Sequence, residues 1–337
     1  MTGAGKPARF PGSAWGAVFV LAASVLWGTT GTAATFAPDV SPLAIGAAAM
    51  GLGGLLQAGI AAGPMRAFRA DLRSQWPILA LGTLAVALYP LAFYSSMHLA
   101  GVAVGTVVSI GSAPLASAII ERVVDRRPLT GRWTAGALLG VGGAVLLCLA
   151  GAGNADGGLR PAASTSSAPA GIALGLLAGL TYALYSWAAH RLINAGVPSR
   201  AVMGSVFGVG GLLLMPVLLV TGTPLIASWQ NFAVGAYMAL VPMFAGYVLF
   251  GWGLARVRAS TATTLSLAET VVAAVLAVVV VGERLPEHGW VGAAMIAASL
   301  FVLTVPIPRK RTTAVAAADA AGTEAQGTEA ESSLIPR

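Results

Sequence analysis

Ten apolar runs, each long enough to cross a lipid bilayer, alternate along this chain with short polar connections. Crossing roughly 30 Å of hydrocarbon takes about 20 residues of α-helix. Only 9% of the residues are charged and 57% are hydrophobic, whereas soluble domains carry about 25% charged residues. The sequence therefore predicts an all-α integral membrane protein with ten transmembrane helices, at residues 15–36, 43–62, 76–98, 102–121, 133–150, 169–190, 201–220, 230–254, 259–281 and 289–305.

The basic residues lie in every second connection, which predicts how the chain is oriented. One side has only Arg160 and Arg284, with the distal Arg337 left out. Cytoplasmic loops carry an excess of lysine and arginine, so we expect both termini in the cytoplasm and a multi-pass protein of the cell (plasma or inner) membrane. The net charge of +7 is divided among these clusters, so we expect the lipid bilayer as a partner and no nucleic acid. The sixteen residues of the basic side are Lys6, Arg9, Arg66, Arg69, Arg73, Arg122, Arg126, Arg127, Arg132, Arg191, Arg200, Arg256, Arg258, Arg309, Lys310 and Arg311.

The two halves of the chain superpose when the sequence is shifted by 156 positions. Pro42 then falls on Pro198, and RRPLTGRWTAGALL (126–139) falls on GERLPEHGWVGAAM (282–295). Because each half contains five spans, an odd number, the halves enter the membrane from opposite sides, and such inverted repeats place a substrate site between them near the bilayer midplane. The predicted segments are a cytoplasmic N-terminus (1–14), a first repeat (15–150), an external linker (151–168), a second repeat (169–305) and a disordered cytoplasmic tail (306–337).

Several short motifs, in order and spacing, resemble the EamA branch of the drug/metabolite transporter superfamily. They are LWGTTG (26–31) in the first span, Pro114 in the fourth, and AET…VVGERLPEHGWVGAAMI (268–296) across the last two. The resemblance covers about residues 12–306 and implies two inverted five-helix repeats that export amino acids, other metabolites or toxic compounds. Thr270 stands where family members usually have a proline after the acid of the ninth span, so the sequence leaves open whether the kink implied by that proline occurs in this chain.

Glu269 is an acid in the middle of the ninth apolar run. It lies about 16 Å along the helix from Arg258, at ~1.5 Å per residue, and an ionised group at that depth is costly and seldom accidental. Thr263, Ser266 and Glu269 follow each other at intervals of three residues and predict a polar stripe on one helix face. Glu269 could bind a substrate ammonium or carry a coupling proton; the alternative is a protonated acid bonded between helices.

Aromatic and hydroxyl side chains gather at similar depths in corresponding spans of the two halves. Such rings suit amphipathic or cationic solutes through stacking and cation–π contacts, although any one of them could simply fill the core. Prolines inside the spans are candidate hinges, because neighbouring groups can satisfy the freed backbone. The candidate substrate-binding residues are Glu269, Trp27, Thr30, Tyr89, Phe93, Tyr182, Tyr185, Tyr247 and Ser266, and the candidate hinges are Pro90, Pro114 and Pro242.

The polar residues argue against a membrane enzyme, which would need a metal cluster, a nucleophile with its base, or paired midplane carboxylates. One midplane acid and no midplane histidine are too few, so we expect no cofactor and no metal. Phosphorylated sugars and nucleotides are disfavoured, because their anionic groups call for Lys or Arg and the span interiors have none.

The favoured function is export of small amino-acid-like or other metabolites by alternating access through a central cavity, with protons as a candidate coupling ion. The alternatives are efflux of drugs or cationic compounds, and a non-transporting scaffold or sensor. GxxxG spacings, as at Gly136/Gly140 and Gly204/Gly208, predict close helix contacts within a monomer or a weak homodimer. Glu121 and Asp125 stand beside arginines at the cytoplasmic edge, where we expect solvated ion pairs.

Overall fold

The apolar runs form helices that are long enough to span a bilayer. The structure is a computed structural model that describes residues 12–100, 102–153, 168–282 and 285–305. Every regular element within these ranges is helical. Nine helical stretches in them are long and apolar enough to cross a membrane, and the shorter apolar stretch Gly131–Leu147 supplies the tenth. The predicted all-α membrane fold is thereby confirmed.

The described residues of the first repeat form seven helices, two of which are short. Its second span begins at Ser41, whose hydroxyl accepts from the amide of Ala44 at 3.2 Å, and Pro42 follows as the first helical residue. Serine as a cap and proline in the first turn are the preferred start of a helix. The helices are α1 (Gly12–Gly28), α2 (Thr30–Thr35), α3 (Pro42–Ala67), α4 (Arg69–Ser74), α5 (Trp76–Ala100), α6 (Val102–Val123) and α7 (Gly131–Gly153).

The second repeat has the same order of spans but more interruptions. Its second span begins at Ser199, next to Pro198, which is the position equivalent to Pro42. Its third and fourth spans are each divided into shorter pieces. The elements are α8 (Ala168–Asn194), α9 (Ser199–Thr221), the 3₁₀ turn η1 (Thr223–Ile226), α10 (Trp229–Met238), the π-helical segment η2 (Ala239–Ala245), α11 (Gly246–Leu254), α12 (Ala259–Leu265), α13 (Ala268–Leu276), the π-helical segment η3 (Ala277–Val281) and α14 (Glu287–Thr304).

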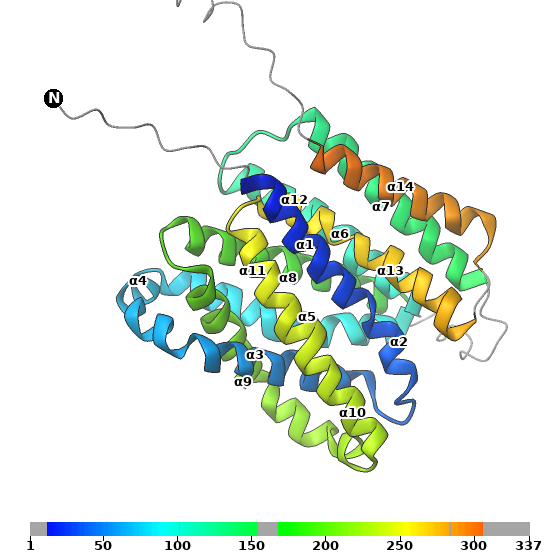
Figure 1. The fold of residues 1–337 in the computed structure, drawn as a ribbon, viewed down its shortest axis with the longest axis horizontal. Coiled ribbons are helices and arrows are strands. Elements are labelled where there is room, and N and C mark those ends of the chain that lie inside the picture. The colour runs from blue at the N-terminus through cyan, green and yellow to red at the C-terminus, as the bar shows by residue number, and fades with distance from the viewer. Residues whose placement is uncertain (1–11, 101, 154–167, 283–284, 306–337) are drawn as a thin grey trace, which may run out of the picture. The chain divides into compact units, whose positions relative to one another are not determined.

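The contacts between spans are symmetric under exchange of the two repeats. The second spans pack on each other, α3 on α9, and so do the fifth spans, α7 on α14, which lie side by side in Figure 1. The third span of each repeat packs on the first span of the other, α5 on α8 and α11 on α1. The fourth spans do the same, α6 on α8 and α13 on α1. The core is therefore built between the repeats, as the inverted-repeat prediction requires.

Small residues let these helices approach closely. A Cβ on Gly54 of α3 would lie 2.2 Å from the carbonyl oxygen of Phe207 on α9, and a Cβ on Gly143 of α7 would lie 2.6 Å from that of Gly292 on α14. Gly136, Gly140, Gly171, Gly175, Gly179, Gly204 and Gly208 also meet neighbouring helices at short range. The GxxxG prediction is confirmed as contacts inside the chain.

The described helices belong to one compact unit. The N-terminal residues 1–11, most of the predicted external linker and the predicted disordered tail 306–337 lie outside the described residues, as do Glu283 and Arg284.

Candidate functional site

Nine aromatic rings form one continuous cluster where the two repeats meet. All six predicted aromatic residues belong to it. Trp27 of α1 lies 4.9 Å from Tyr247 of α11 between ring centroids, and Tyr89 of α5 lies 5.7 Å from Tyr182 and 5.8 Å from Tyr185, both on α8. Phe93 stacks on Tyr89 at 5.7 Å. The cluster therefore joins the first and third spans of one repeat to those of the other.

Three members of the cluster, Tyr94, Phe207 and Phe250, were not among the residues predicted from the sequence. Phe250 lies 5.1 Å from Trp27, and Phe207 lies 4.3 Å from Tyr247. Tyr247 and Phe250 are three residues apart and so share a helix face, which is a signal the sequence offered. Phe207 stands alone on α9, and only the packing of α9 against the third spans brings it in.

Hydrogen bonds fix the polar ends of these rings. The Tyr185 and Tyr247 hydroxyls lie 2.9 Å apart. Tyr182 donates its hydroxyl to Ser266 Oγ at 2.8 Å, and the Ser266 hydroxyl donates in turn to the Thr263 carbonyl at 2.9 Å. Buried tyrosines usually find such partners. Ser266 thus holds Tyr182 in place in this conformation.

Burial divides the predicted residues into two groups. Trp27, Tyr182, Tyr185, Tyr247 and Ser266 are buried, with exposed fractions between 0% and 6%. The other four, Thr30, Tyr89, Phe93 and Glu269, are half-buried. The first group forms the packed body of the cluster, and the second group forms its half-buried margin.

Glu269 follows directly after a break in the ninth span. Helix α12 ends at Leu265 and α13 begins at Ala268. At the break, the Leu267 amide donates to the Thr264 carbonyl at 3.2 Å and the Glu269 amide donates to the Ser266 carbonyl at 3.0 Å. Both bonds span three residues, as in a 3₁₀ turn.

The break answers a question that the sequence left open and corrects one expectation. The helix is interrupted although Thr270 replaces the proline of the family, and the Thr270 hydroxyl donates to the Leu267 carbonyl at 2.7 Å. The predicted continuous stripe of Thr263, Ser266 and Glu269 is interrupted, because the break separates Glu269 from the two hydroxyl residues. Serine and threonine hydroxyls that bond to nearby carbonyls compete with helix bonds, which gives the bend a local cause.

The first span is interrupted at the same place in space. Helix α1 ends at Gly28, and Thr30 begins α2 with its hydroxyl donated to the Trp27 carbonyl at 2.7 Å. A Cβ on Gly28 would lie 2.8 Å from the Glu269 carbonyl oxygen and 2.6 Å from Val272 Cβ. Only glycine fits there, so the end of α1 lies directly against the start of α13.

The three candidate hinge prolines differ in their settings. Pro90 and Pro114 lie inside α5 and α6, which continue without interruption past them. Pro242 lies in η2, where the Gly246 amide donates to the carbonyls of Val241 and Met243, on either side of Pro242. The Pro242 carbonyl accepts from Trp27 Nε1 at 2.9 Å. A π-helical segment thus ties the third span of the second repeat to the aromatic cluster.

The basic end of the bundle departs from the predicted solvated ion pairs. Glu121 is buried, with 2% of its surface exposed, and accepts from the Ser260 amide at 3.0 Å and the Ser260 hydroxyl at 2.7 Å. Asp125 forms an ion pair with Arg191 of α8, and its carboxylate accepts a hydrogen bond from Trp187 Nε1 at 2.9 Å. The prediction was therefore wrong for Glu121, and Asp125 has a partner from another helix.

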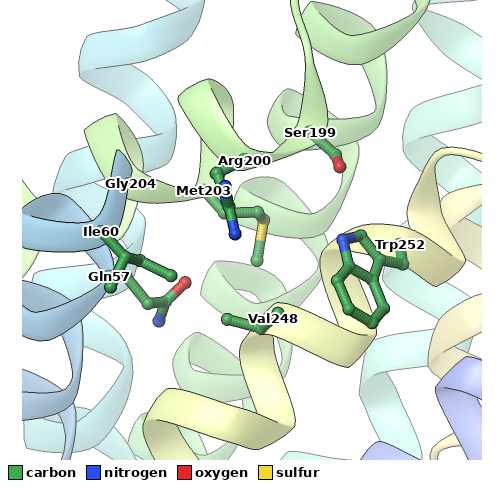
Figure 2. A pocket seen from close by; sticks show the side chains of 8 residues that line it. All are labelled: Gln57, Ile60, Ser199, Arg200, Met203, Gly204, Val248 and Trp252. Carbon is green, nitrogen blue, oxygen red and sulfur yellow. The ribbon is translucent and has the colours of Figure 1, made fainter. Parts of the chain in front are cut away.

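Two cavities lie toward this end. The smaller, of about 20 Å³, is bordered by α3, α9 and α11, with Gln57, Arg200 and Trp252 around it (Figure 2). It has room for about one water molecule, and both polar atoms of the buried Gln57 side chain have no hydrogen-bond partner among the described residues. The larger, of about 340 Å³, includes Glu121 and Ser260 in its wall. Within the described ranges, no group of three or more His, Cys, Asp or Glu side chains could hold a metal ion.

Ten spans in two inverted repeats, with a shared aromatic and acidic centre between them, define a membrane transporter. The model of the EamA-like transporter family matches residues 14–149 and again residues 169–305. The chain belongs to this family, and its resemblance to the EamA branch is confirmed.

Similar proteins agree with this class. The uncharacterized transporter YwfM of Bacillus subtilis (strain 168) is 33% identical over 302 residues, which are 89% of this chain and 97% of that protein. An uncharacterized transporter of Archaeoglobus fulgidus is 30% identical over 132 residues, 39% of this chain and 47% of that protein. A protein of known crystal structure, 23% identical, shares the fold with a TM-score of 0.67, over 86% of this chain and 96% of its own. These relatives indicate a multi-pass membrane transporter and not an enzyme.

Proposed function

We propose that this protein exports small amino-acid-like metabolites by alternating access, with the margin of the aromatic cluster as the substrate site. The observation that carries the proposal is the position of Glu269. It is half-buried and follows three residues after Ser266, which bonds Tyr182 of the cluster, and its backbone carbonyl lies directly against the end of α1. A carboxylate there matches a substrate ammonium, and the rings match its apolar part.

The two breaks support movement at this place. Helix termini leave backbone groups that can bind a substrate or an ion, and discontinuous helices at the repeat interface are the usual site architecture of inverted-repeat transporters. Glu269 belongs to the ninth span and Trp27 to the first, so a shift of one repeat against the other changes the surroundings of both. We propose that Glu269 also carries the coupling proton.

Efflux of hydrophobic cations is the second candidate function. It is favoured by the same acid and by the number of rings, because aromatic faces attract cations. The cluster members named above include no lysine or arginine. An amino-acid substrate needs a partner for its carboxylate as well, and a cation does not.

Counterflow in proteoliposomes tests the proposal and separates these candidates. Purified protein is reconstituted, loaded with unlabelled amino acids or with cationic dyes, and assayed for uptake of the labelled compound with and without a pH gradient. We expect amino-acid counterflow that responds to the gradient. Counterflow of cations alone favours the second candidate, and no flux of any compound supports a scaffold or sensor.

Glu269→Gln gives the sharpest variant, with Glu287→Gln as its matched control. Glu287 is an exposed acid in the first turn of α14 and has no ring of the cluster on its helix. We expect Glu269→Gln to abolish the response to the pH gradient and Glu287→Gln to leave it intact. Unchanged transport and unchanged pH response in Glu269→Gln would overturn the role of this acid.

A further inference from the structure

The larger cavity lies between the repeats, at the basic end of the bundle. Its volume of about 340 Å³ is far above the space that one water needs and lies in the range of small-molecule sites. The first repeat contributes Glu121 and Trp133, and the second contributes Arg256, Arg258 and Ser260. Relative movement of the repeats would therefore change this cavity.

The cavity wall holds one buried acidic side chain among the described residues. Glu121 uses one carboxylate oxygen for the Ser260 amide and the other for the Ser260 hydroxyl. A carboxylate has about four lone-pair sites, so two such bonds leave acceptor capacity. A buried carboxylate is stable when it is paired and fully hydrogen-bonded, and a ligand ammonium would complete the set.

The same wall holds donors suited to a negative group. Arg258 lies at the N-cap position of α12 and lines the cavity. Trp133 also lines it, is 9% exposed, and its buried indole N–H has no hydrogen-bond partner within the described part of the chain. Arg256 is engaged elsewhere, because it donates to the Trp252 carbonyl at 2.7 Å and lies over the Phe19 ring. Buried polar groups rarely stay unpaired in native proteins, so the Trp133 N–H is a donor in need of an acceptor.

We propose that this cavity is an inner binding site for a free zwitterionic amino acid, distinct from the aromatic cluster. The ligand ammonium binds Glu121, and its carboxylate binds Arg258 and the Trp133 indole N–H. The proposal rests on the proposed function, since the cavity then receives the solute at the predicted cytoplasmic end before it reaches Glu269. A simple anion would face the Glu121 carboxylate, and a simple cation would face the arginines.

Three probes that share the isobutyl group of leucine test the charge requirement. L-leucine carries both groups, isopentylamine has lost the carboxylate, and 4-methylpentanoate has lost the amine. Binding is measured by calorimetry on the full chain in phosphatidylcholine nanodiscs, in the Glu269→Gln background so that the aromatic site does not contribute. We expect leucine to bind, and each truncated probe to bind at least about tenfold more weakly, because a charge-assisted bond is lost. Equal binding of the three probes would overturn the site.

Variants then assign the binding to this cavity. Glu121→Gln is expected to weaken leucine binding by about tenfold or more. Trp133→Phe removes the indole N–H without touching the Glu121–Ser260 bonds, and is expected to weaken leucine but not isopentylamine. Asp125→Asn, a change of an acid on the same end but outside the cavity wall, serves as the control. Wild-type leucine affinity in folded Glu121→Gln and Trp133→Phe proteins would overturn the assignment.

Further results distinguish a free amino acid from a lipid head group in this cavity, and the inner site from the proposed transport function. Leucine binding that is competed away in phosphatidylethanolamine nanodiscs would mean that a lipid head group is the natural occupant, and the proposal for a free amino acid would fail. Counterflow of amino acids with no binding to the cavity would sink the inner site alone. Binding that depends on Glu121, without any counterflow, would leave the inner site standing and sink the proposed transport function.

Discussion

The contact between α3 and α9 gives a prediction that can be worked out from distances. A Cβ on Gly54 would lie 2.2 Å from the Phe207 carbonyl oxygen, whereas ordinary van der Waals contact begins at 3.4 Å. Gly54→Ala must therefore push the two helices apart by about 1.2 Å along that line. The obstacle is backbone, which cannot turn aside as a side chain can. Overpacking of this kind costs about 1–3 kcal/mol.

The matched control is Gly59→Ala on the same helix, where nothing lies within 4 Å of the new methyl group. Both variants gain the same helix propensity, about 1 kcal/mol in peptides, so their difference reports the helix contact. The assay is the midpoint of thermal unfolding in detergent, followed by loss of the monodisperse peak in size-exclusion chromatography. We expect Gly54→Ala to melt roughly 2–10 °C below Gly59→Ala. Equal midpoints would refute the close packing of α3 on α9.

Two more predictions concern the aromatic cluster and the orientation. Tyr185→Phe and Tyr247→Phe should each lower stability by about 1 kcal/mol, since each leaves one buried hydroxyl unpaired, and the double variant should lose less than the sum; strictly additive midpoints would contradict the bond. In a Cys148→Ser background, a membrane-impermeant maleimide should label a Trp229→Cys variant in intact cells. It should label an Arg256→Cys variant only after the cells are opened, and the reverse pattern would overturn the predicted orientation.

The span pattern was accessible from the sequence because it depends on local physics. Apolar runs of bilayer length must form helices, since every backbone group has to be satisfied within the membrane. The 156-residue offset then predicted which helices correspond, and the symmetric contacts follow from it. The aromatic residues could be chosen because they recur at similar depth in corresponding spans, as Trp27 and Tyr182 do.

The departures arise where long-range packing decides. Glu121 stands beside Arg122 in the sequence, yet α12 covers it and Ser260 bonds it. The break at Ser266 contains neither glycine nor proline, and the available signal was the density of hydroxyl residues, Thr263, Thr264, Ser266 and Thr270, that bond to carbonyls three or four residues back. Pro114 shows the converse, because a proline inside a span left its helix unbroken.

The break in the ninth span creates an asymmetry between otherwise equivalent halves. Thr270 and Pro114 occupy matching positions under the 156-residue shift, but the helix is interrupted just before Thr270 and continuous through Pro114. If the fourth span of the first repeat were interrupted and that of the second were continuous, the repeats would make equivalent contacts. The substrate site would then open to the opposite side of the membrane. The bend would then form in α6, where proline already lacks the N–H that a straight helix needs. On this view Pro114 is a hinge that is used only in the opposite conformation. Pro114→Ala should therefore slow turnover without weakening solute binding in the form described here.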